Sequence, residues 1–64
     1  MWQVEEMSPV GQPVQFSAVR REGGREMERS GSCRSRAGLP YFPTRAEAEQ
    51  HVSALRWIEH SHTE

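Results

Sequence analysis

A helix-start signal in the C-terminal third of the chain constrains the fold more than any other feature. Thr44 and Glu47 have the T-x-x-E spacing of a capping box, which satisfies free backbone N–H groups of a first helical turn. An amphipathic helix is therefore predicted over about residues 45–59, because one face carries Ala48, His51, Val52, Leu55 and Ile58. In a chain of 64 residues, the remainder must form a small sheet that this helix covers.

The residues before the helix indicate three short strands, at about 2–7, 13–21 and 25–34. Apolar and polar residues alternate in the first two, and Gly and Pro residues between them mark a break. Residues 37–40 have the composition of a turn. We therefore expect an α+β domain spanning residues 1–64, with a three-stranded antiparallel sheet packed against one C-terminal helix and a polar tail at 60–64.

The pair Gly23-Gly24 predicts a hairpin between the second and third strands, because two glycines accept the positive φ angles of a type I′ turn. That turn fixes a register. The facing pairs are expected to be Glu22–Arg25, Arg21–Glu26, Arg20–Met27, Val19–Glu28, Ala18–Arg29 and Phe16–Gly31. Two of these pairs join opposite charges, which supports the assignment.

Composition excludes several kinds of protein. Cys33 is the only cysteine, so no internal disulfide can form. The longest apolar run is two residues, which excludes a signal peptide and a membrane span, and we expect a complete cytoplasmic protein. Neither a P-loop nor a nucleophile or metalloprotease motif occurs, and adjacent Glu5 and Glu6 point to opposite faces of a strand. We therefore expect a non-enzymatic protein with no cofactor.

Trp57 lies on the side of the predicted helix opposite the apolar stripe, beside the small or polar residues Gln50, Ser53 and Ala54. A tryptophan in such a place is typical of a docking surface for another protein. Dimerisation through the same face would stabilise so short a chain. The alternative is that the helix ends early and Trp57 folds back onto the core.

A second candidate surface is rich in arginine. All eight cations of the chain are arginines, and residues 20–36 hold six of them against three glutamates: Arg20, Arg21, Arg25, Arg29, Arg34 and Arg36. Guanidinium groups on a β-hairpin can contact DNA phosphates or base edges, or an acidic protein. The alternative is a solvated, ion-paired strand pair, which the three glutamates and the net charge of −1 favour.

The histidines and the cysteine offer weaker sites. His60 and His62, with His51 or Glu59, have the right chemistry for a metal, but they lie near a chain end that is prone to fray. We therefore expect no metal site. Cys33 has arginines beside it that would favour its thiolate, yet without a second cysteine a passive role is the better interpretation.

Residues 41–49 resemble the F-x-T-[RK]-x-E-A entry to the closing helix of many small bacterial and phage β-β-α domains. These include the AP2-like arm-binding domains of phage integrases, in which the sheet lies in the major groove of DNA. The resemblance covers nine residues and implies the fold more than the function. By size alone, the chain also resembles phage or plasmid accessory proteins, including inhibitors of host defence such as anti-CRISPRs.

The sequence thus predicts a small binding protein that docks on a protein or nucleoprotein partner, in the manner of a phage or mobile-element inhibitor. Trp57 and the arginine-rich hairpin are its expected contacts. The alternative function is that of a small DNA-binding domain that uses the hairpin.

Overall fold

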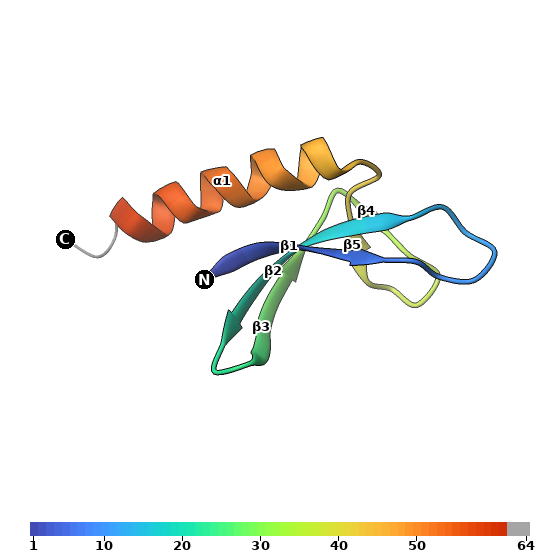
Figure 1. The fold of residues 1–64 in the computed structure, drawn as a ribbon, viewed down its shortest axis with the longest axis horizontal. Helices are drawn as coiled ribbons and strands as arrows, with labels where there is room; N and C mark the ends of the chain where they lie inside the picture. The colour runs from blue at the N-terminus through green and yellow to red at the C-terminus, as the bar shows by residue number, and fades with distance from the viewer. Residues whose placement is uncertain (62–64) are drawn as a thin grey trace.

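The computed structural model describes residues 1–61 of the chain as an α+β fold (Figure 1). Three antiparallel strands form the main sheet in the order β1-β2-β3, and one C-terminal helix packs on one of its faces. Two very short strands form a second sheet. The elements are β1 (Trp2–Met7), β2 (Gln15–Glu22), β3 (Arg25–Ser30), β4 (Cys33–Arg34), β5 (Pro40–Tyr41) and α1 (Arg45–Ser61).

The β2–β3 hairpin turns at Gly23 and Gly24, whose φ angles of 59° and 80° are those of the expected tight turn. The predicted register is right for Glu22–Arg25 and Arg21–Glu26, and wrong beyond them. A β-bulge leaves Met27 as an extra residue on β3. The pairs are therefore Arg20–Glu28, Val19–Arg29 and Ala18–Ser30.

The third strand is shorter than predicted, because β3 leaves the sheet after Ser30. Phe42 takes its place beside Phe16, so the expected Phe16–Gly31 pair does not form. Gly31 instead passes against the main chain of Tyr41, where a Cβ atom would lie 2.1 Å from the tyrosine nitrogen. Only glycine allows this crossing. The segment that was expected to extend β3 to residue 34 instead contributes β4, which pairs with β5.

Helix α1 begins at Arg45, as the capping signal predicts, and the Thr44 hydroxyl accepts a hydrogen bond of 3.3 Å from the backbone N–H of Glu47. The helix runs to Ser61, so it includes the first two residues of the expected polar tail. The last three residues of that tail, among them His62, lie outside the described part of the chain.

The core lies between α1 and the sheet. Its buried members are Trp2, Ala18, Phe42, Ala48 and Val52, and Val4, Phe16 and Leu55 lie half-buried around them. The apolar stripe of the helix is therefore only partly covered. Ile58, which was expected in the core, is 48% exposed, because the helix residues that pack in or against the core end at Leu55, one turn earlier.

The molecule is elongated, with principal extents of 45 × 24 × 15 Å. Its radius of gyration is 12.2 Å, whereas a compact chain of this length would have about 10.7 Å. Figure 1 shows why: the C-terminal end of α1, the β2–β3 hairpin and the β1–β2 loop project in three directions. Within residues 1–61, no helix has the length and hydrophobicity needed to cross a bilayer.

Candidate functional site

The outer face of α1 presents the exposed tryptophan that the helical spacing predicts. Trp57 is 72% exposed, and the three residues expected beside it, Gln50, Ser53 and Ala54, are also exposed. The spacing of these positions places them along one side of the helix. Trp57 is therefore an aromatic side chain on a surface of small and polar residues, and it lies outside the core.

A polar contact joins the C-terminal part of α1 to the sheet. Nε of Arg56 donates a hydrogen bond of 2.8 Å to the carbonyl oxygen of Trp2, the first residue of β1. The helix has 17 residues and so a length of about 25 Å. The core reaches along the helix only as far as Leu55. We call the turns beyond it, residues 56–61, the overhang. Trp57 and Ile58 lie there, and both are exposed.

Three arginines of the hairpin are bound to glutamates. Arg20 pairs with Glu28 at 3.0 Å and also with Glu22. Arg21 donates to both carboxylate oxygens of Glu5. Each guanidinium that is already neutralised in this way is less available to a phosphate, because a new contact would have to replace an existing ion pair.

Arg29 completes this network on the face of the sheet opposite α1. Its guanidinium donates two hydrogen bonds to Glu26, of 2.7 and 3.2 Å, and lies 3.7 Å from Glu5. The hydrogen bonds from Arg21, more than the charge of Arg29, lower the pKa of Glu5 from 4.5 to about 2. The hydrogen bonds from Arg29 likewise lower the pKa of Glu26. We call Glu5, Arg21, Glu26 and Arg29 the ion-pair network.

The ion-pair network explains why Val19 is buried although α1 does not cover it. Val19 is fully buried, yet in the strand alternation it faces away from α1. Its cross-strand neighbour Arg29 is itself largely buried, with a side chain only 12% exposed. The aliphatic stems of the arginines thus cover Val19 while their charged ends bind carboxylates. This role for the arginines was missed by the sequence analysis.

The other three arginines, Arg25, Arg34 and Arg36, differ in the partners of their guanidinium groups. Arg34 donates to the carbonyl oxygen of Gly38 at 3.1 Å and so holds the turn between β4 and β5. For Arg25 and Arg36, no ion pair or hydrogen bond of the guanidinium is found within residues 1–61. Arg25 lies beside the hairpin turn and Arg36 lies in the β4–β5 turn, so the six arginines do not form one continuous cationic surface.

His51 and Cys33 have local structural surroundings. The Nε2 atom of His51 lies 3.1 Å from the Ser30 hydroxyl, and its ring packs at 5.0 Å against Phe42. Cys33 is half-buried, with its sulfur 3.8 Å from the Ser32 hydroxyl. In the part of the chain that the structure describes, no three His, Cys, Asp or Glu side chains are grouped so that they could hold a metal.

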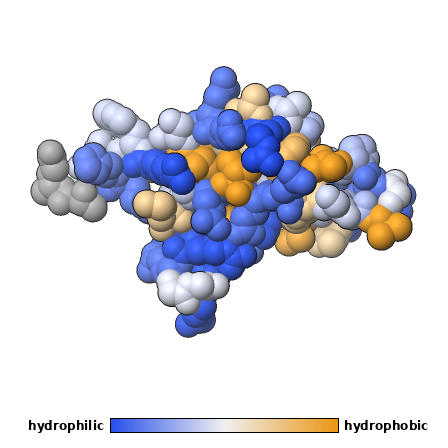
Figure 2. All heavy atoms as spheres, viewed as in Figure 1, coloured by the Kyte–Doolittle hydropathy of each residue, from blue (hydrophilic) through white to orange (hydrophobic). Residues whose placement is uncertain are grey.

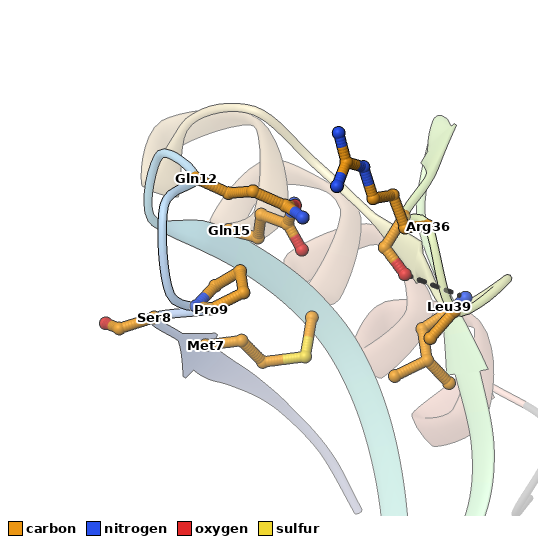
Figure 3. Close-up of a pocket in the computed structure, with 9 residues that line it drawn as sticks. Met7, Ser8, Pro9, Gln12, Gln15, Arg36 and Leu39 are labelled. Carbon is orange, nitrogen blue, oxygen red and sulfur yellow. Dashed lines mark hydrogen bonds between the residues drawn. The ribbon is translucent and has the colours of Figure 1, made fainter.

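A pocket that the sequence analysis did not predict lies at the end of the molecule where the β1–β2 loop meets the β4–β5 turn (Figure 3). It has a volume of about 410 Å³ and is lined by Met7, Ser8, Pro9, Gln12, Gln15, Ser35, Arg36, Ala37 and Leu39. These residues come from segments far apart in the sequence, so no local pattern could have indicated the pocket.

No family model, curated protein or solved structure matches this chain. The resemblance of residues 41–49 to the helix entry of small β-β-α domains therefore stays a prediction.

Proposed function

We propose that this protein is a non-enzymatic binding protein whose outer helix face docks on another protein. The observation that carries the proposal is the 72% exposure of Trp57. A tryptophan is costly to leave in water and is among the residues that contribute most to protein interfaces. Gln50, Ser53 and Ala54 would surround it as a rim of small and polar contacts.

The position of Trp57 on the overhang supports the proposal. The last turns of α1 project from the body of the molecule, so a partner can approach Trp57 without meeting the sheet. The half-exposed Ile58 adds apolar area on the same overhang. A second copy of this chain is one candidate partner, because burial of this face would stabilise a domain with so small a core.

DNA binding through the hairpin is the less supported function. Arg20, Arg21 and Arg29 are each bound to at least one glutamate, and the hairpin surface is largely hydrophilic (Figure 2). A DNA-binding surface gains affinity from cations that can neutralise phosphates and release counterions. Here the glutamates already supply that neutralisation.

The test is capture from a lysate of the native host by immobilised wild-type protein and by Trp57→Ala, with mass spectrometry and nucleic-acid detection. Sedimentation at increasing concentration measures self-association of both proteins. The proposal predicts at least one protein, or a dimer, that the variant loses. A partner that is retained by Trp57→Ala, lost on nuclease treatment and lost by an Arg20, Arg21 and Arg29 triple alanine variant would favour DNA binding instead. The expectation that the partner belongs to a host defence system would be tested by the same capture.

A further inference from the structure

The pocket between the β1–β2 loop and the β4–β5 turn combines apolar walls with a single charge. Met7 and Pro9 on one side and Leu39 on the other supply apolar surface, and Figure 3 shows the side chains of Met7 and Leu39 reaching toward each other. Leu39 is 41% exposed, which leaves this wall free for contact. A pocket of this kind accepts an aliphatic or aromatic side chain.

Arg36 is the only ionisable side chain among the residues that line the pocket. Its guanidinium has no ion pair or hydrogen bond within residues 1–61. Residues 29–46 add four arginines and no acidic residue. The two carboxylates nearest to Met7 along β1 are both paired, Glu5 with Arg21 and Glu6 with Arg45. The electrostatic preference of this site is therefore for a negatively charged ligand.

The polar lining suits a peptide main chain. The Gln12 amide and the Ser35 hydroxyl can each donate a hydrogen bond to a peptide carbonyl, because the hydrogen bonds that they make with Gln15 and Leu39 use them as acceptors. The buried Gln15 is held in place, since its amide donates to Oε1 of Gln12 at 3.2 Å. Met7 completes the apolar wall, and its sulfur accepts a hydrogen bond of 3.5 Å from Nη1 of Arg29.

We propose that this pocket binds an acidic peptide segment that inserts one apolar side chain between Met7 and Leu39 and places a neighbouring carboxylate on Arg36. A guanidinium can bind a carboxylate through two parallel hydrogen bonds, which fixes the direction of the peptide. The β1–β2 loop and the β4–β5 turn, which line this site, lie at the opposite end of the molecule from the C-terminal end of α1 (Figure 1). The inference is therefore independent of the proposed function of the helix.

The experiment is a titration of the ¹⁵N-labelled full chain with an acetylated and amidated decapeptide that has one leucine between glutamates in a glycine–serine background. Saturable binding in the high-micromolar range is expected, with amide shifts confined to residues 7–15 and 35–39. Replacing the leucine by serine in the peptide should abolish binding. Arg36→Gln should weaken it about fivefold, and Ala37→Glu should abolish it through like-charge repulsion.

Arg25→Gln is the matched control, because it removes the same charge from another arginine whose guanidinium has no ion pair or hydrogen bond within residues 1–61, and it should leave the affinity unchanged. Positions 25, 36 and 37 are all exposed, so these variants should fold, and circular dichroism checks this. The proposal is overturned if no saturable binding occurs up to roughly 5 mM peptide. It is equally overturned if Arg25→Gln and Arg36→Gln weaken binding alike, if the shifts map to residues 50–57, or if a single-stranded oligonucleotide binds this pocket in preference to the peptide.

Discussion

In this protein, charged side chains cover a face of the sheet that a second layer of secondary structure would cover in a larger protein. Val19 is fully buried on the face of the sheet that has no helix. The ion-pair network covers it, and Glu5 lies at its centre because both Arg21 and Arg29 approach its carboxylate. A partly buried carboxylate with two cations contributes more to stability than an exposed ion pair.

The ion-pair network predicts a pH-dependent loss of stability. The pKa of Glu5 is lowered from 4.5 to about 2 in the folded protein, so its contribution is complete above pH 4.5 and is lost as the pH falls toward 2. Glu5→Gln should lower the free energy of unfolding by about 2 kcal/mol at pH 7. Urea denaturation should show this difference shrinking from about pH 4.5 toward pH 2. Glu28→Gln, in an exposed ion pair, is the control that should change stability little. An equal loss at pH 7 and at pH 2 would contradict this account of Glu5.

Gly31 is a second residue on which the fold depends. A Cβ atom at this position would meet the nitrogen, Cα and carbonyl carbon of Tyr41 at 2.1–2.5 Å, and main-chain atoms cannot move aside as a flexible side chain can. Gly31→Ala should therefore cost about 3 kcal/mol or more and leave little folded protein. Gly11→Ala is a useful comparison, since no atom lies near its Cβ position and only its positive φ of 73° opposes the change. Thermal unfolding of both variants measures the difference in stability. A Gly31→Ala protein as stable as wild type would contradict the close approach of Gly31 to the main chain of Tyr41.

At the scale of elements, short sequence motifs were sufficient to predict the features that depend only on neighbouring residues. The Thr44 cap and the Gly23-Gly24 turn each act within a few residues, and both the helix start and the hairpin follow from them. The end of β3 at Ser30 coincides with a contact from a distant residue, because Phe42 pairs with Phe16 at the edge of β2. The close approach of Gly31 to the main chain of Tyr41 could not be inferred from the hairpin alone.

The helix cap can be tested directly. Thr44→Ala removes the acceptor for the backbone N–H of Glu47 and should lower the free energy of unfolding by about 1 kcal/mol. Thr44→Ser keeps an acceptor and should restore most of the loss. The denaturant midpoints of the three proteins measure the effect. If Thr44→Ala has the wild-type midpoint, this hydrogen bond contributes nothing to the stability of α1.

At the scale of the whole molecule, two candidate surfaces lie at opposite ends of an elongated body (Figures 1 and 3). The exposure of Trp57 was predictable, because the position of a residue around a helix follows from spacing alone. The pocket beside Arg36 was not, because its walls come from residues 7–15 and 35–39 and meet only in the folded chain. An ion-paired hairpin was one of the two interpretations of the arginines, but the part of Glu5 was not predicted, since it reaches Arg21 from another strand.

The most direct test of the central proposal is the affinity of Trp57→Ala for the protein that the wild type captures, or for itself if the wild type dimerises. The variant should fold normally, because Trp57 lies outside the core, and should bind about 30-fold more weakly at both low and moderate salt. Val10→Ala removes another exposed apolar side chain, far from α1 in the β1–β2 loop, and should bind as wild type does. Unchanged affinity of Trp57→Ala, or its failure to fold, would contradict the proposal that the outer helix face is the docking surface.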